Sequence, residues 1–201
     1  MTEAKEPGFS SLKQGSTDPD AVQDYYDDWA DNYDDTLESW NYQAPANAAA
    51  VLSKKLTEGT HILDMGCGTG LLGKALAAQF ACRVDGLDIS EASLGLAKET
   101  GCYENLTQHD FSHYPFPLTS QKYDAAACVG VMTYIEDERA FLSEMARGVR
   151  PEGYILFTHR DDIWQNRRTE QTVRELEQSG MWVVEDISAP QEGVQNSVSL
   201  A

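Results

Sequence analysis

The feature that most constrains the fold is a short apolar run that leads into three glycines at alternate positions. Ile62, Leu63 and Met65 predict a buried strand, and the glycines follow at positions 66, 68 and 70. Without Cβ atoms, these glycines let the backbone turn sharply and approach a ligand closely. Apolar residues at 71, 72, 75 and 76 then recur at helical spacing, so the loop should end at the free N–H groups of a helix. The strand, the loop and the helix together predict a ligand-binding cradle.

Asp64, within this strand, narrows the kinds of ligand. Its carboxylate would repel a polyphosphate but could hold an ammonium or sulfonium centre. The dinucleotide pattern G-x-G-x-x-G needs glycine or alanine at position 71, where this chain has leucine, so a nicotinamide-dependent oxidoreductase is a distant alternative. The phosphate-loop pattern matches from Gly68 to Lys74, but Ala75 has no hydroxyl group for Mg²⁺ and the match runs into the predicted helix. We therefore expect a ligand with a cationic centre.

The length, the net charge and the cysteine spacing of the chain limit the classes of protein to which it can belong. A chain of 201 residues with 41% apolar residues is typical of one domain, here expected over 19–201 after a polar tail at 1–18. Asp and Glu number 33 against 15 Lys and Arg, so the net charge of -18 makes nucleic acid a poor partner. The cysteines form no C-x-x-C pair, which predicts reduced thiols, no metal site and a cytoplasmic location. We expect neither a membrane span nor a signal peptide. We also expect the protein to be a monomer.

Helical and strand patterns alternate along the rest of the chain. Val22, Tyr26, Trp29 and Tyr33 recur at steps of three and four, which predicts a helix with an aromatic stripe. Further helices are expected at 45–56, 91–100, 137–148 and 167–178, strands at 83–88, 106–109, 123–129, 154–158, 181–187 and 194–200, and a turn at 151–153. Such alternation predicts an α/β fold with a mostly parallel sheet, helices on both faces and ligands outside the carboxyl ends of the strands.

Acidic residues follow the next two strands after the glycine loop. Asp88 closes its strand 22 residues beyond Gly66, where a carboxylate can accept both hydroxyls of a ribose. Ile89 offers an apolar face for adenine. A role for Asp88 in capping the following helix is the alternative, although Ser90 suits that role better. Asp110 and Phe111 could receive an exocyclic amine and a purine ring, or could equally be a turn aspartate and a core phenylalanine.

These residues resemble a known family. Residues 62–70 (ILDMGCGTG) look like the first motif of the class I methyltransferases that use S-adenosylmethionine, and Asp88 and Asp110 stand where the second and third motifs of that family fall. Residues 26–34 (YDDWADNYD) and 41–45 (NYQAP) are similar to a narrower group, the methyltransferase-like proteins named after the Williams-Beuren syndrome region. The resemblance implies a Rossmann-like, mostly parallel seven-stranded sheet with an antiparallel last strand.

The resemblance also implies roles for individual residues. The methionine part of S-adenosylmethionine would lie among Asp64, Gly66, Cys67 and Gly68. Asp88 would take the ribose, Ile89 and Phe111 would enclose adenine, Asp110 would receive its amino group, and Cys128 would offer backbone contacts. Residues 19–56 would form a helical lid in which Tyr26, Trp29 and Tyr33 touch the methionine end. An aromatic stripe is by itself more typical of packing, and the Cys128 thiol is more typical of a small buried side chain than of a nucleophile.

Methyl transfer asks little of the protein beyond alignment of the acceptor and exclusion of water. If the acceptor arrives protonated, Tyr134 and His159 are weak candidates for a base, and Arg160 could receive a substrate carboxylate. A lone histidine is more often a packing residue, and Arg160 could simply pair with Asp161 or Asp162. We expect a methyltransferase acting on a small molecule. The alternatives are a protein methyltransferase and a protein that binds the cofactor without catalysis.

The ribose assignment makes a prediction. Asp88→Ala should weaken binding of S-adenosylhomocysteine by about 1 to 3 kcal/mol, because the ribose hydroxyls lose their acceptor. Titration calorimetry measures the effect, and unchanged affinity would contradict the assignment.

Overall fold

The computed structural model describes residues 16–24, 26–27, 42–188 and 196–200. Residues 19–24, 26 and 27 are helical, in line with the start of the predicted aromatic helix. Trp29 and Tyr33, predicted to lie further along this helix, fall outside the described residues, as does most of the predicted tail.

Within the described ranges, seven strands form one sheet, in the order β3-β2-β1-β4-β5-β7-β6. Their bounds are β1 (His61–Met65), β2 (Arg83–Asp88), β3 (Asn105–Gln108), β4 (Tyr123–Cys128), β5 (Val149–His159), β6 (Val184–Ile187) and β7 (Asn196–Leu200). The first five in this order pair in parallel, and β7 pairs antiparallel with both β5 and β6. The predicted α/β fold, with a mostly parallel sheet and an antiparallel last strand, is confirmed.

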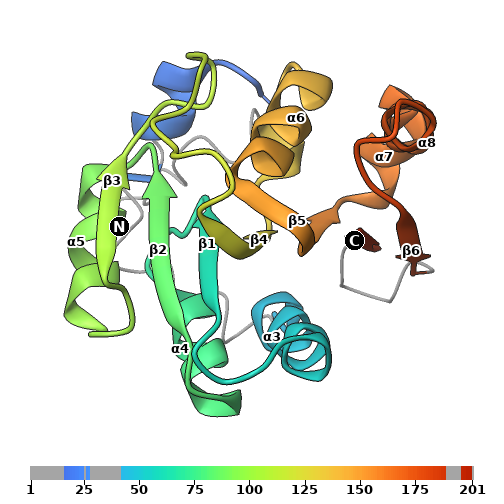
Figure 1. Cartoon of the computed structure of the whole chain (residues 1–201). Coiled ribbons are helices and arrows are strands. Elements are labelled where there is room, and N and C mark those ends of the chain that lie inside the picture. The colour runs from blue at the N-terminus through green and yellow to red at the C-terminus, as the bar shows by residue number, and fades with distance from the viewer. Residues whose placement is uncertain (1–15, 25, 28–41, 189–195, 201) are drawn as a thin grey trace.

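Helices cover both faces of the sheet (Figure 1). Their bounds are α3 (Ala44–Lys55), α4 (Leu71–Gln79), α5 (Glu91–Glu99), α6 (Glu138–Gly148), α7 (Asp161–Arg167) and α8 (Thr169–Gln178), with a 3₁₀ turn, η1, at Met132–Tyr134. None of the helices in the described ranges has both the length and the apolar character that a bilayer crossing requires.

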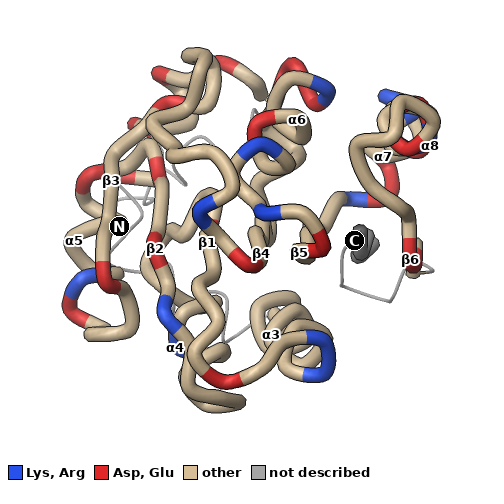
Figure 2. Tube along the Cα trace, in the orientation of Figure 1, with Lys and Arg blue, Asp and Glu red and all other residues tan. Residues whose placement is uncertain are grey.

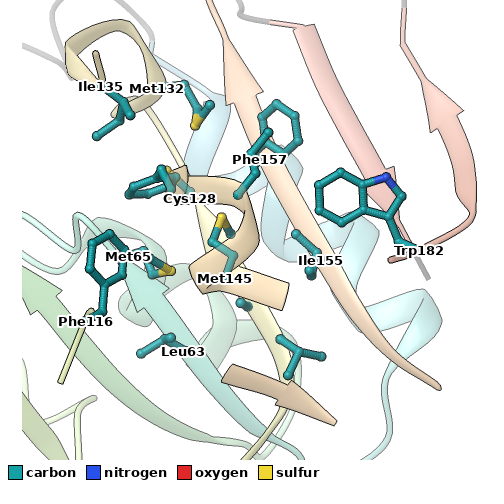
Figure 3. Packing of buried hydrophobic residues seen from close by; sticks show 14 of the residues in the cluster. Leu63, Met65, Phe116, Cys128, Met132, Ile135, Met145, Ile155, Phe157 and Trp182 are labelled. Atoms are coloured by element: carbon teal, nitrogen blue, oxygen red, sulfur yellow. The ribbon is translucent and has the colours of Figure 1, made fainter. Parts of the chain in front are cut away.

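Alternate residues of the central strands feed two separate cores, because successive side chains of a strand point to opposite faces. Ile62 and Ala125 pack with residues of α3 and α4 on one face. Leu63 and Ala126 pack with residues of α6 and α8 on the other. Figure 3 shows part of the second core, where Leu63 lies among the sulfur-containing and aromatic side chains of neighbouring elements. Burial on both faces explains why β1 reads as a continuous apolar run interrupted only by Asp64.

Polar side chains fix the starts of two helices. Ser90 is the N-cap of α5, and its Oγ accepts a hydrogen bond from the N–H of Ser93 at 3.0 Å. Asp137 is the N-cap of α6, and its Oδ1 accepts from the N–H of Ala140 at 2.9 Å. The expectation that Ser90, and not Asp88, caps its helix is therefore confirmed.

Two elements differ from the sequence-based expectation. The predicted turn at 151–153 does not separate two elements, because β5 is continuous from Val149 to His159 and the extra residues form a bulge between its pairings with Tyr123 and Ala125. The predicted helix at 167–178 begins at Thr169, since Arg168 adopts a left-handed conformation (φ 56°) between α7 and α8. The sequence pattern missed α7, a seven-residue helix whose only fully buried side chain is Trp164.

The strand order reverses beside β1, which pairs with β2 on one side and β4 on the other. In open α/β sheets, ligands bind at such a point, outside the carboxyl ends of the strands. Figure 1 shows the N-terminal segment of residues 16–27, in blue, on the same side as the arrowheads of β2 and β3. This segment therefore lies over the edge of the sheet where a ligand is expected.

The opposite edge of the sheet holds a buried ionic cluster around Asp85. Its Oδ2 accepts from Lys122 Nζ at 2.6 Å and Tyr123 Oη at 3.0 Å, its Oδ1 accepts from Asn105 Nδ2 at 2.8 Å, and His61 Nε2 lies 3.2 Å from Oδ2. Burial alone would raise the pKa of Asp85, but these donors lower it to about 2. The Lys122 ammonium, 2.6 Å from Oδ2, balances the charge of the Asp85 carboxylate, so the cluster joins the starts of β1, β2 and β4 by an ion pair and hydrogen bonds.

The cluster predicts acid-sensitive stability. Because the folded state lowers the pKa of Asp85 from its ordinary value to about 2, its contribution, about 2 kcal/mol, is complete above pH 4 and is lost as the pH falls towards 2. Asp85→Asn should therefore lower the free energy of unfolding at pH 6, and the difference from wild type should shrink at pH 3. Urea denaturation followed by circular dichroism measures both. Asp186→Asn, at an exposed position of β6, is the matched control. A deficit that is equal at the two pH values would contradict the ionic explanation.

Candidate functional site

Two neighbouring cavities lie at the carboxyl ends of the strands. The main cavity, of about 360 Å³, is lined by the glycine loop, the end of β2, residues 110–112 and 114, residues 129–131 and 134–137, and the N-terminal segment. A smaller cavity, of about 40 Å³, is lined by Tyr42, Asp64, the glycine loop and the start of α4. Gly66, Gly68 and Val129 line both, so the two form one continuous site.

The glycine loop takes a shape that other residues could not adopt. The N–H groups of Gly66 and Cys67 donate to the carbonyl of Leu87 at 2.7 and 3.0 Å, which ties the loop to the end of β2. Gly66 has a φ of 80°, and a Cβ atom there would lie 2.1 Å from Cγ2 of Val131. Gly68, with a φ of 51°, has open space where its Cβ would lie. The loop therefore exposes its backbone to the cavities.

Asp88 both shapes the loop and lines the main cavity. Its Oδ2 accepts from the N–H of Gly68 at 2.7 Å, and its Oδ1 accepts from the N–H of Ser90 at 2.9 Å. Burial raises the pKa of Asp88, although these backbone donors oppose the shift. Each carboxylate oxygen can accept further hydrogen bonds, so the position suits the predicted contact with ribose. Asp88→Ala would also release Gly68.

Ile89, Asp110 and Phe111 line the main cavity as well. Asp110 accepts from the N–H and the hydroxyl of Ser112 at 2.8 and 2.9 Å, and Phe111 packs against Phe116 with ring centroids 5.3 Å apart. Asp110 therefore stabilises a turn and Phe111 packs against the core, as the alternative interpretation of these residues predicted. These roles coexist with positions at the cavity wall, where both side chains remain available to a ligand.

The N-terminal segment forms another wall. Tyr26 lines the main cavity and packs edge-to-face on Tyr134, with ring centroids 5.9 Å apart. The hydroxyl of Ser90 donates to Asp27, so this segment is also bonded to the N-terminus of α5. The predicted proximity of Tyr26 to the site agrees with this geometry, whereas Trp29 and Tyr33 lie outside the described residues.

The smaller cavity adds Tyr42, which the sequence analysis left without a role although it lies in a segment used for the resemblance. Burial raises the pKa of the Tyr42 hydroxyl, with contributions from Tyr134 and Cys128. Its oxygen would lie 2.9 Å from a Cβ at Gly130, where φ is 82°. Asp64 is 1% exposed, and burial raises its pKa to about 7.

The two cysteines at the site are buried thiols. Cys67 lines the smaller cavity, and burial raises its pKa, as do Asp64 and Asp88. Cys128 is fully buried and lines neither cavity, although the next residue, Val129, lines both. Burial also raises the pKa of the Cys128 thiol, so the expectation of a buried side chain without a nucleophilic role holds.

Two of the candidate catalytic residues are not at the site. His159 was expected at the mouth of the site, but it is fully buried, with Nε2 3.0 Å from Oε1 of Glu138. Its position at the end of β5 directs it into the core, between the sheet and α6. Arg160 lines neither cavity and donates to both carboxylate oxygens of Asp162 at 3.1 and 2.7 Å. Only Tyr134 of the three candidates lines the main cavity.

Residues 131–137, which sequence analysis did not single out apart from Tyr134, form much of the cavity wall. Arg167 of α7 holds this segment from behind by donating to the carbonyls of Ile135 at 2.6 Å and Thr133 at 3.0 Å. Glu138 lies 3.4 Å from the same guanidinium group. No local pattern marks an arginine for such a role, because its partners are backbone atoms some thirty residues away.

The residues present fit S-adenosylmethionine. The open space beside Gly68, the carboxylate of Asp88 and the apolar side chains of Ile89 and Phe111 suit an adenosine. The smaller cavity, with the carboxyl group of Asp64, suits a cationic amino acid.

The loop geometry predicts a selective loss of binding. Gly66→Ala should weaken binding of S-adenosylhomocysteine at least about tenfold, because the new Cβ collides with Val131 and φ is unfavourable. Gly95→Ala, in α5 with open space around its Cβ, should leave affinity unchanged and stabilise the fold by about 0.5 to 1 kcal/mol. Calorimetry and thermal unfolding measure both. Equal affinities for Gly66→Ala and wild type would show that the loop does not contact the ligand.

Comparisons with known proteins agree with this site. The family model of the methyltransferase domain matches residues 62–153. Human methyltransferase-like protein 27 is 31% identical over 172 residues, which cover 82% of this chain and 70% of that protein. The ubiquinone biosynthesis O-methyltransferase of Alkalilimnicola ehrlichii is 31% identical over 108 residues, but the match spans only 42% of its length and 50% of this chain.

Solved structures share the fold. The magnesium protoporphyrin IX methyltransferase of Synechocystis PCC 6803 with bound S-adenosylmethionine has a TM-score of 0.70 at 19% identity, covering 91% of this chain and 96% of that chain. An S-adenosylmethionine-dependent methyltransferase structure from Methanococcus maripaludis has a TM-score of 0.69 at 16% identity, covering 100% and 96%. The glycine loop and the acidic strand ends agree with the match to the methyltransferase domain and with the similarity to human methyltransferase-like protein 27. This chain therefore belongs to the class I S-adenosylmethionine-dependent methyltransferases.

Proposed function

We propose that this enzyme transfers the methyl group of S-adenosylmethionine to a small, neutral or cationic molecule held in the main cavity. The observation that carries the proposal is the extent of that cavity. It reaches from the strand ends that suit adenosine to a chamber walled by the N-terminal segment and residues 131–137, which leaves room beside the cofactor for a second, small ligand.

In this proposal the cofactor spans both cavities. Adenosine lies against Asp88, Ile89, Asp110 and Phe111 in the main cavity. The amino-acid end lies in the smaller cavity beside Asp64 and the backbone of the glycine loop. The methyl group would then face the region between the cavities, near Val129 and the buried hydroxyl group of Tyr42.

The charge of the cavity wall supports a neutral or cationic acceptor. The described residues that line it include Asp88, Asp110, Glu136 and Asp137, but neither lysine nor arginine. An anionic acceptor would meet repulsion there, whereas a cation would be attracted to the carboxylates and to the faces of Tyr26 and Tyr134. Figure 2 shows the Lys and Arg residues in ones and twos among the described elements, which gives little support to a nucleic-acid substrate.

When bound, the cofactor supplies a methyl group that is already activated by the sulfonium charge. The protein side of the reaction is then alignment and exclusion of water. Tyr26 and Tyr134, packed edge-to-face, would together form the wall against which the acceptor lies. Arg167, through the carbonyl groups behind η1, would keep that wall in place.

The narrower relationship is also proposed. The match to human methyltransferase-like protein 27 extends well beyond residues 62–153, which supports the group suggested by residues 26–34 and 41–45. A cytoplasmic monomer remains our proposal for the state in which the enzyme acts. The names of the O-methyltransferases among the relatives are compatible with transfer to an oxygen atom of a neutral acceptor.

The test uses labelled S-adenosylmethionine and a cell extract separated by size. We expect label in the metabolite fraction with wild-type protein and with Gly95→Ala, and at least about tenfold less with Gly66→Ala when S-adenosylmethionine is below saturation. Label in the protein fraction would overturn the proposal in favour of a protein methyltransferase. S-adenosylhomocysteine binding without transfer in any fraction would favour a binding protein without catalysis.

A further inference from the structure

We propose that Tyr103 is a positioning residue for the cofactor: its hydroxyl group fixes Asp64 and the start of α4 so that Asp64 meets the ammonium group of S-adenosylmethionine. The inference rests on the proposed placement of the amino-acid end of the cofactor in the smaller cavity. No motif of the sequence marks Tyr103, which lies in the connection between α5 and β3.

The hydroxyl group of Tyr103 joins two parts of the site. It donates to Oδ2 of Asp64 at 2.7 Å and accepts from the N–H of Gly73 at 3.1 Å. The N-cap of α4, Gly70, has no side chain that could cap the helix. The Gly73 N–H, in the first turn, has no intrahelical acceptor, and the Tyr103 hydroxyl accepts its hydrogen bond instead. One hydroxyl therefore replaces the missing cap and holds Asp64, which among the described residues is the only one with a carboxyl group that lines the smaller cavity.

The ring of Tyr103 lies beneath the glycine loop. A Cβ at Gly73 would lie 2.6 Å from the ring, and Cβ atoms at Gly70 and Gly86 would each lie 3.1 Å from it. Three glycines on three elements thus make room for this one ring. Gly73, which in the sequence resembled part of a phosphate loop, is explained by the tyrosine packed against it.

The Tyr103 hydroxyl opposes the groups around Asp64 that disfavour its charged form. Asp64 is almost wholly buried, and Asp88 on β2 adds a like charge, so both raise the pKa of Asp64, which reaches about 7. Cys67 in the loop and Cys128 at the end of β4 face it as thiols whose pKa is raised. The hydrogen bond from Tyr103 opposes these effects and stabilises the carboxylate.

A consequence for binding follows. Below pH 7 Asp64 carries a proton, and a neutral carboxyl group attracts an ammonium group far less than a carboxylate does. Removing the Tyr103 hydroxyl should raise the pKa of Asp64 further, because the carboxylate loses a hydrogen bond that favours its charged form. As the pH falls, the variant should then lose cofactor affinity at a higher pH than the wild-type protein does.

The experiment measures S-adenosylhomocysteine binding by calorimetry from pH 6 to pH 9 with wild type and Tyr103→Phe. We expect the ratio of dissociation constants, variant over wild type, to be about tenfold at pH 6 and to fall towards one at pH 9. Taking the ratio at each pH cancels the titration of the ligand itself. A ratio that is the same at every pH would overturn the inference, because a merely structural effect does not depend on the protonation of Asp64.

Two controls separate the explanations. Tyr123→Phe removes another Tyr–Asp hydrogen bond, to Asp85 at 3.0 Å, at the opposite edge of the sheet, and should lower stability with a ratio near one throughout. 5′-Methylthioadenosine, which lacks the amino-acid end, should also give a ratio near one with Tyr103→Phe; a pH-dependent ratio with this ligand would contradict the inference. Failure of the wild-type protein to bind S-adenosylhomocysteine would instead overturn the proposed function.

Discussion

The two hydrogen bonds that carry the chain from β1 into the glycine loop determine most of the site. Gly66 and Cys67 both donate to the carbonyl of Leu87, so the turn at the end of β1 is fastened to the end of β2. Asp88, the next residue, accepts from Gly68. A side chain at Gly66 would collide with Val131, which lies beyond β4. Three strand ends are thus brought into contact around one short segment, and the cavities form beside it.

Much of this arrangement could be predicted from sequence because its signals are local. The glycine spacing, the strand ending at Asp88 and the cap at Ser90 each depend on a few neighbouring residues, and all lie where the pattern indicated. Parallel pairing then brings the strand ends together without further information, so Asp88, Ile89, Asp110 and Phe111 meet at one cavity. The α/β fold follows from the same alternation of strands and helices.

The residues that sequence reasoning missed act across the fold. Tyr103 reaches Asp64 over 39 positions, and Arg167 reaches backbone carbonyls over more than thirty. His159 was misplaced for a related reason, since a strand end alone does not reveal which face a side chain takes when a bulge precedes it in β5. The start of the predicted helix at Thr169, and its separation from α7, depend on a single left-handed residue at Arg168, for which arginine gives no signal.

The two sides of the main cavity are formed by different kinds of chain segment. The side proposed for the cofactor consists mainly of strand ends and the glycine loop. The other side consists of residues that belong to no strand: Thr17, Pro19, Val22, Tyr26, Val131, Tyr134, Ile135, Glu136 and Asp137. Substitutions at lining positions that neither face Gly66 nor enter the core, such as Tyr134 and Glu136, would therefore change the size and polarity of the chamber without disturbing the sheet or the glycine loop. Evolution can in this way exchange the molecule that is methylated while the donor site stays constant, and a protein engineer can do the same.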